Sequence, residues 1–435
     1  MVIALIIFLI TYALMLAFQQ YRPYIALTSA AIFIILGYVG MYDFDLISAL
    51  SAVDYNVLLM IGGTMGTVTL FIESRMPARL AELLISKVPN VKWAVCVLAL
   101  FAGIISAFVD NVATVLMVAP VGLAISRKLN ISPVPVLISI AVSSNLQGAA
   151  TLVGDTTSIL MGGYADMTFL DFFWMQGKPG IFWAVEAGAL VSLVALLILF
   201  RKDKQPVSAK VETEVTDYLP SVLMIGTVVC LIIASFVPEP AGGALLTIYN
   251  LRSGLICLAI CIIGVVATIA KQGSSKIVLT VVKGLDKDTL LLLFGLFMVI
   301  EGITVAGVID AIADLFYNIA GDSPFMLYTL IVFASVLLSA FIDNIPYVAT
   351  MLPVVTSIAA TMGVEPYVFY FGLLSGATLG GNLTPIGASA NITAIGILRK
   401  NGELVKVSDF LRIGLPFTLS AVITGYIVIW VIWGI

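Results

Sequence analysis

Carboxylate and amide side chains stand inside apolar stretches of this 435-residue sequence. Asp110-Asn111 and Asp343-Asn344 each interrupt a long apolar run, and Asp155 interrupts another. Carboxylate, amide and hydroxyl oxygens are the ligands that hard cations prefer, and a buried carboxylate can also carry a proton. Because charge inside an apolar run is costly, these residues predict an ion site, with helix N-capping as the structural alternative for each aspartate.

The candidate site residues form two half-sites, one in each half of the chain, and lie in four polar breaks. The first group is Asp110, Asn111, Ser144, Asn145, Thr151 and Asp155, and the second is Asp343, Asn344, Thr378, Asn382, Thr384 and Asn391. Glycines and Pro385 permit the chain to unwind there, which frees backbone carbonyls for a cation. A sodium ion would use Asp110, Asn111, Asn145, Asp343, Asn344 and Asn382. Glu186 and Glu301 lie near predicted span ends, where snorkelling to water competes with a role in the pathway.

The elements that position these residues are predicted to be membrane helices. Hydrophobic residues make up 61% of the sequence and charged residues 11%, against roughly 25% charged in a soluble domain. The expected fold class is therefore an all-α polytopic membrane protein in contact with lipid. A net charge of -4 gives no basic surface for nucleic acid, and the absence of His removes the usual zinc ligand. We expect no enzyme and no cofactor beyond Na⁺ or H⁺ as coupling ion.

Two apolar runs, 93–126 and 326–359, are too long for a single crossing, and each carries its Asp-Asn pair near the middle. We expect each to form a re-entrant hairpin, although two full crossings fit the loop charges equally. Runs 134–163 and 367–398 are expected to be broken helices. The excess of Lys and Arg in cytoplasmic loops places linker 201–218 and Arg22 inside and both termini outside, in a prokaryotic plasma membrane.

The two halves of the chain repeat one another at a fixed spacing of 233 residues. Ser106 to Asn111 recurs as Ser339 to Asn344, and Gly154 recurs as Gly387. This predicts a first unit over 1–200 and a second over 219–435, each with five transmembrane helices and one hairpin. An odd number of crossings inverts the second unit. Inverted repeats with broken helices are typical of secondary transporters, whose site lies near the midplane.

At its four breaks the sequence resembles the arsenite-pump and sodium–proton antiporter permease group of the ion-transporter superfamily, in particular P-protein-like members with a citrate-transporter-like domain. The matching motifs are Phe108 to Val112, Ser144-Asn145 followed by Gly154-Asp155, Phe341 to Pro346, Gly380 to Asn382, and Gly387 to Asn391. The resemblance implies a homodimer, with a scaffold domain and a transport domain that moves like an elevator.

The expected function is a secondary active transporter that moves a small inorganic ion or metalloid, arsenite among them, by antiport or symport with H⁺ or Na⁺. Dicarboxylate carriers of the superfamily have Ser-Asn-Thr at the hairpin tips, whereas Asp110 and Asp343 precede the Asn here, which argues against a di- or tricarboxylate. The alternatives are a Na⁺-coupled citrate or dicarboxylate symporter and an anion channel.

Overall fold

A computed structural model describes residues 1–207 and 211–434 of the protein. Residues 208–210 of the predicted linker and the last residue of the second predicted unit lie outside the described residues. The secondary-structure elements of the described chain are all helices except for one antiparallel pair of two-residue strands, which pairs Trp174 with Pro179.

The first half of the chain, which ends at the linker, contains ten α-helices. In order they are α1 (Val2–Ala17), η1 (Gln19–Tyr21), α2 (Arg22–Tyr38), α3 (Leu46–Ser51), α4 (Tyr55–Glu73), α5 (Met76–Ile85), α6 (Val91–Ser106), α7 (Asn111–Lys128), α8 (Pro133–Gly148), α9 (Thr156–Tyr164), η2 (Leu170–Phe172), β1 (Trp174–Met175), β2 (Lys178–Pro179) and α10 (Ile181–Leu199).

The described part of the second half contains eleven α-helices. They are α11 (Leu219–Ala234), α12 (Ala244–Asn250), α13 (Arg252–Gln272), α14 (Lys276–Gly284), α15 (Lys287–Val305), α16 (Val308–Ala320), α17 (Pro324–Ser339), α18 (Asn344–Met362), α19 (Tyr367–Gly380), η3 (Gly381–Leu383), α20 (Ser389–Lys400) and α21 (Val407–Trp433).

Seven helices within the described residues are long and apolar enough to cross a membrane, or eight if α16 and α17, which meet at a bend of 116°, count as one span. The expected crossings at 2–18 and 219–237 are the shorter apolar helices α1 and α11. The expected broken helices are divided between α8 and α9 and between α19 and α20. A mostly helical, polytopic membrane fold is therefore confirmed.

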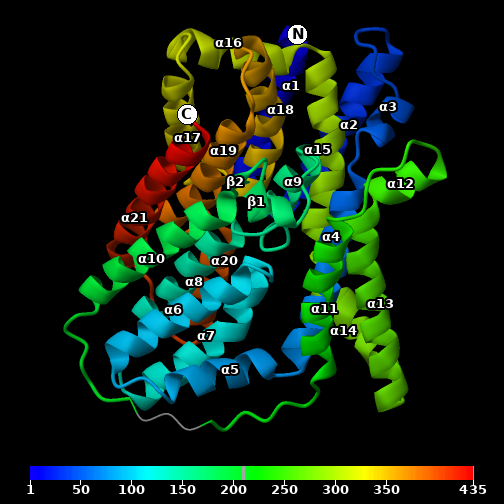
Figure 1. The fold of residues 1–435 in the computed structure, drawn as a ribbon. Helices are drawn as coiled ribbons and strands as arrows, with labels where there is room; N and C mark the ends of the chain where they lie inside the picture. The colour runs from blue at the N-terminus through cyan, green and yellow to red at the C-terminus, as the bar shows by residue number, and fades with distance from the viewer. Residues whose placement is uncertain (208–210, 435) are drawn as a thin grey trace.

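The two predicted hairpins lie toward opposite ends of the molecule. Figure 1 shows α6 and α7 near the lower end and α17 and α18 near the upper end. Between the halves, α10 packs against α21, α2 against α15, and α4 against α13. Helices α4 and α15 begin in the same way, because Asp54 accepts a hydrogen bond from the Val57 amide (2.9 Å) and Asp286 from the Thr289 amide (3.0 Å).

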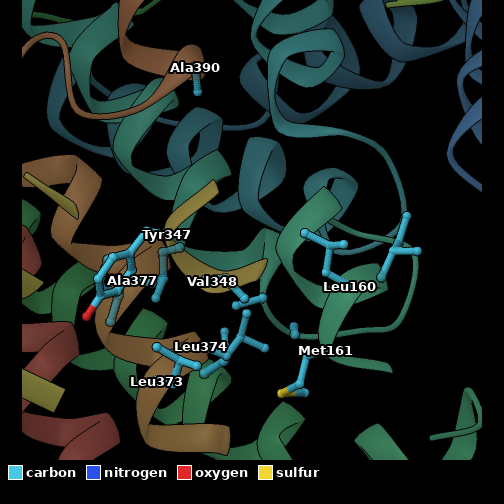
Figure 2. Packing of buried hydrophobic residues seen from close by; sticks show 14 of the residues in the cluster. Leu160, Met161, Tyr347, Val348, Leu373, Leu374, Ala377 and Ala390 are labelled. Carbon is cyan, nitrogen blue, oxygen red and sulfur yellow. The ribbon is translucent and has the colours of Figure 1, made fainter. Parts of the chain in front are cut away.

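One continuous core surrounds the helices that carry the breaks. Figure 2 shows Leu160 and Met161 of α9 beside Val348 of α18 and Leu373 and Leu374 of α19. All five side chains are at most 3% exposed. Helix α9 and its neighbours α18 and α19 are therefore fixed by burial of apolar surface, which holds the polar start of α9 in place.

The described part of the linker is bound along the segment from α4 to α6. The backbone amides of Val91 and Lys92 donate to the carbonyls of Gln205 and Asp203, and Thr216 donates to Ser74. Glu82 of α5 accepts from the Thr213 hydroxyl at 2.7 Å and from the Thr213 amide at 2.9 Å. The linker therefore acts as a strap that fixes the connection leading into the first hairpin.

The strap is expected to loosen in acid. Burial raises the pKa of Glu82, but the hydrogen bonds from Thr213 and Glu212 outweigh it and lower the pKa below its ordinary value. A carboxyl whose pKa is lowered by folding contributes stability above its unfolded pKa and loses it as pH falls through the folded value. Amide exchange at Glu212 and Thr213, corrected for intrinsic rates, should become faster across that acid range.

Glu82→Gln should show weak protection of those amides at neutral pH already. Glu214→Gln is the control, because Glu214 is an exposed residue of the same linker. Equal protection in all three proteins at every pH would contradict a strap held by the Glu82 carboxylate.

Candidate functional site

Asp110, Asp155 and Asp343 each cap the N-terminus of a helix that starts at a break. Asp110 Oδ1 accepts from the amides of Val112 (3.0 Å) and Ala113 (3.1 Å). Asp155 Oδ1 accepts from Thr156, and Asp343 Oδ1 accepts from Ile345. The structural alternative of helix capping is thus confirmed for all three, but it uses only one oxygen of each carboxylate.

The second oxygen distinguishes the three aspartates. Asp155 Oδ2 accepts from the Thr157 hydroxyl at 2.9 Å, and Asp343 Oδ2 accepts from Arg22 Nη1 at 2.6 Å. Among the described residues, no hydrogen bond or ion pair reaches Asp110 Oδ2. Asp110 is therefore the one aspartate at a break whose carboxylate retains a free acceptor.

Asp110 borders a cavity of about 220 Å³ between the first hairpin, α4 and the start of α15. Of the predicted residues, Asp110, Asn111, Asp155 and Asn344 line this cavity. Two carboxylates that we did not predict, Glu73 and Asp286, line it as well, and no Lys or Arg is among its described lining residues. The cavity is therefore an electronegative environment that favours cations over anions.

Asn344 is the clearest unused polar group in the cavity. Its residue is only 5% exposed, and its side chain has no hydrogen bond within the described part of the chain. Its repeat mate Asn111 instead donates to Asn145 Oδ1 at 2.9 Å. Because Asn344 borders the cavity and its amide has no partner among the described residues, it marks a position where an additional group can bind.

A chain of amides joins the two halves behind the cavity. Asn145 Nδ2 donates to the Thr378 carbonyl (2.8 Å) and to Asn382 Oδ1 (3.2 Å), while Asn382 Nδ2 donates to the Val142 carbonyl at 2.9 Å. Asn145 and Asn382 are both fully buried. The sequence-predicted groups from the two halves are therefore in direct contact at this point.

Removal of the Asn145 amide should destabilise the protein strongly. Asn145→Ala leaves Asn111 and Asn382 with buried polar groups unpaired, which should lower the free energy of unfolding by roughly 2–4 kcal/mol. The thermal unfolding midpoint in detergent should fall accordingly. Asn250→Ala is the control, because Asn250 is an exposed residue at the end of α12. An equal midpoint for the two variants would show that the amide chain does not hold the halves together.

The remaining predicted residues bond mainly to backbone in the breaks. Thr151 donates to the Ala107 carbonyl, and its repeat mate Thr384 donates to the Ala340 carbonyl at 2.5 Å. Ser144 donates to Ser106 and the Asn111 carbonyl, Thr378 lies 3.3 Å from the Thr157 hydroxyl, and Asn391 donates to the Gly381 carbonyl. These side chains thus position the unwound segments rather than line the cavity.

Glycine is required where each broken helix crosses its hairpin. A Cβ on Gly154 would lie 2.5 Å from the Gly148 carbonyl oxygen and 2.8 Å from that of Ala107. A Cβ on its mate Gly387 would lie 2.7 Å from the Gly381 oxygen and 2.8 Å from that of Ala340. The crossings are therefore close contacts between backbones.

Two features of the site were not predicted. Loop charge predicts Arg22 among the cytoplasmic loops, and the structure pairs its side chain with Asp343 at the tip of the second hairpin. The pairing also leaves Asp343 outside the described lining of the cavity. The sequence signal that could have found Arg22 is that it stands between two short apolar runs.

The two broken helices are not equivalent in charge. Asp155 caps α9, whereas the matched cap of α20 is Ala388, which offers no side-chain hydrogen bond. Thr157, which donates to Asp155 and lies next to Thr378, was also missed, although it stands two residues after the predicted aspartate.

Comparison with known protein families identifies the family of the chain. The family model described as citrate transporter, CitMHS, matches residues 12–249 and 243–434. The chain belongs to the citrate transporter family. The more specific arsenite-pump and sodium–proton antiporter group is not established by this match.

Several relatives of the chain are named as transporters. Transporter Rv2685 of Mycobacterium tuberculosis is 30% identical over 436 residues, covering 99% of this chain and 98% of that protein. The mouse P protein is 25% identical and covers 86% of this chain, which matches 53% of its length. These relationships place the chain among secondary transporters rather than enzymes.

Two solved transporters share the fold. The YdaH transporter of Alcanivorax borkumensis superposes with a TM-score of 0.58 at 14% identity, covering 96% of this chain and 98% of that one. MtrF of Neisseria gonorrhoeae, described with a class of antimetabolite efflux pumps, gives a TM-score of 0.58 at 16% identity, covering 89% and 82%. At these identities the likeness concerns the fold alone.

Proposed function

We propose that this member of the citrate transporter family moves a small inorganic ion or metalloid across the membrane, coupled to Na⁺ or H⁺ bound at Asp110. The observation that carries the proposal is the free Oδ2 of Asp110 in a cavity without described basic lining residues. Asn344 supports it, because its unbonded amide faces the same cavity.

The arrangement suits a monovalent cation better than a multivalent metal. Within the described residues, no group of three or more acidic or cysteine side chains is close enough to hold a metal ion. One carboxylate with neutral amide and hydroxyl oxygens supplies a single negative charge. A bound Na⁺ or H⁺ would neutralise the charge of Asp110, and this lowers the cost of carrying that carboxylate through the apolar barrier.

Na⁺-coupled uptake of citrate is the second candidate, because the family description names citrate. Glu73, Asp155 and Asp286 would repel a free tricarboxylate in the cavity. A cation bound first at Asp110 would reduce that repulsion. Citrate therefore belongs in the test as a substrate that requires the cation.

We further propose two inverted units, 1–200 and 219–435, an elevator motion and a homodimer. The matched bonds Thr151–Ala107 and Thr384–Ala340, at the spacing of 233 residues, support the duplication. The position of the two hairpins at opposite ends supports the inversion (Figure 1). The motion and the homodimer rest on family resemblance.

For orientation we propose a cytoplasmic linker and external termini in a prokaryotic plasma membrane. Both chain ends lie toward the upper end of the molecule in Figure 1, and the linker lies at the lower end, which supports their separation. The exposed side chains of Lys202 and Lys204 in the described linker support the cytoplasmic assignment.

The test is a flux panel on the purified protein in liposomes. A Na⁺ gradient at equal pH and a pH gradient without Na⁺ are imposed separately, with Na⁺, arsenite, inorganic anions and citrate each followed. We expect at least one saturable flux that one cation gradient drives. Flux that is linear in concentration would indicate a channel, and the absence of any cation-driven flux would overturn the proposal.

A further inference from the structure

Arg22 ties the second hairpin to α2. Its Nη1 lies 2.6 Å from Asp343 Oδ2, and the two side chains are 16% and 12% exposed. Its Nε also donates to the Met15 carbonyl at 3.3 Å. Since both charges are largely shielded from water, separation of the pair without new partners would be costly.

The helix that carries Arg22 has a counterpart in the second half. Helix α2 packs on α15 so that the peptide between Ala26 and Leu27 approaches Gly295. Helix α13 packs on α4 so that the peptide between Cys257 and Leu258 approaches Gly63. The two contacts are similar, and they relate Ala26 of α2 to Cys257 of α13, which is two residues off the spacing of 233.

This register places Arg252 within one residue of the counterpart of Arg22. Both arginines are the first residue of their helix. Arg252, however, does not reach a hairpin aspartate. Its Nη1 donates to the Tyr249 carbonyl at 2.9 Å, and its guanidinium lies 3.8 Å from the centre of the Tyr249 ring.

The hairpin aspartates of the two halves are thus in different environments. In the second hairpin, Asp343 is neutralised by Arg22 and lies outside the described cavity lining. In the first hairpin, Asp110 has no basic partner within the described residues and borders the cavity. Arg252 begins α13, where Gly254 lies against Asn56 and Leu59 of α4, and its guanidinium is held on Tyr249.

A second cavity occupies the related position on the other side. Its volume is about 210 Å³, and Asp54, Glu301 and Ala349 are among its lining residues. Asp54 caps α4 as Asp286 caps α15 in the first cavity, and Ala349 is the repeat mate of Leu116, which lines the first cavity. The fold therefore already contains a vestibule into which Asp343 could open.

We propose that Arg22 and Arg252 are alternating counter-ions of the two hairpin aspartates. Arg22 holds Asp343 closed in the present conformation, and Arg252 holds Asp110 closed in the opposite one. The inference rests on the proposed two-state transport cycle. In each state one aspartate is paired internally, and the other faces a cavity where a cation from solution can bind. The arginines are positioning residues that set the balance between the states.

The test measures that balance without measuring flux. Thr69 lines the cavity of Asp110, which reaches the surface at the exposed Glu73. In a Cys230→Ser background, which removes the exposed native thiol, Thr69→Cys reports cavity access through its rate of reaction with a charged, membrane-impermeant thiol reagent. Arg22→Gln should slow labelling about tenfold, and Arg252→Gln should accelerate it, since each variant destabilises a different conformation.

Arg22→Lys and Arg252→Lys retain the charge and should restore labelling toward the parental rate. Ser275→Cys, at an exposed position before α14, should react equally in all variants. Shifts of the same sign in both Gln variants, or no shift in either, would overturn the proposal. If Arg22→Gln does not fold, the two Arg252 variants test the proposal alone. Faster labelling in Arg252→Gln, with a rate near the parental one in Arg252→Lys, supports the proposal. An unchanged labelling rate in Arg252→Gln refutes it.

The two hypotheses fail separately in this design. Labelling requires only a folded protein with two conformations, and it is carried out in liposomes without any imposed ion gradient. If labelling is unchanged in the variants but cation-driven flux is observed, the counter-ion proposal is rejected and the transport function is retained. If labelling shifts in opposite directions but no cation-driven flux is observed, the transport function is rejected and the counter-ion proposal is retained.

Discussion

Asp110→Asn is expected to reduce cation-coupled flux by about 100-fold or more while the protein stays folded. Asparagine is as good an N-cap as aspartate, so the bonds to Val112 and Ala113 can be kept. What is lost is the negative charge and the free acceptor at the cavity. Interactions with a charged group contribute roughly 1.5–3 kcal/mol each, which corresponds to factors of about 10 to 100 in binding.

The measurement is initial flux in liposomes under the gradient that drives the wild type, with unfolding temperature recorded in parallel. Asp45→Asn is the matched control, because Asp45 also caps a helix, α3, but is partly exposed and lies outside the cavity. We expect full flux from that variant. Retention of coupled flux by Asp110→Asn would remove Asp110 from the ion site and with it the main support for the proposed function.

Gly387→Ala is expected to lower the free energy of unfolding by more than about 3 kcal/mol and to abolish transport, because the added methyl meets two backbone oxygens that cannot rotate away. Because the atoms in contact belong to the backbone, no side-chain rotation can relieve the overlap. The broken helix and the hairpin must therefore move apart. Gly154→Ala should behave similarly, since its Cβ would contact three carbonyl oxygens at 2.8 Å or less.

The control for this prediction is Gly396→Ala. Gly396 lies in α20, shortly after the same break, and an added Cβ would meet no atom within 4 Å. Alanine in a helix interior is favoured over glycine by about 1 kcal/mol, so this variant should be neutral or slightly stabilised. Thermal unfolding in detergent compares the two. Equal unfolding temperatures for Gly387→Ala and Gly396→Ala would show that a methyl group fits at the backbone crossing, contrary to the structure.

The polar breaks could be predicted from sequence because their energetics are local. An aspartate inside an apolar run is a good N-cap and favours a helix start, and α7, α9 and α18 start directly after Asp110, Asp155 and Asp343. Helix lengths and the repeat followed from the same patterns. The predicted inversion and domain limits remain proposals.

The partners of the polar groups could not be predicted in this way. Nothing in the spacing of Asn145 and Asn382 distinguishes contact with each other from contact with a ligand. Arg22 and Asp343 are separated by 321 residues, and only the packing of α2 on α15 brings them together. Glu73 and Asp286 stand at ordinary helix ends in sequence and become cavity residues through tertiary packing.

The unequal caps of α9 and α20 have a consequence for the direction of transport. If the motion exchanges the roles of the two halves, an ion entering from one compartment meets Asp155 beside its binding place, whereas an ion entering from the other meets Ala388. The same carrier would then hold its ion more tightly on one face than on the other. Such a molecule rectifies: at equal and opposite driving forces, its forward and backward turnover differ.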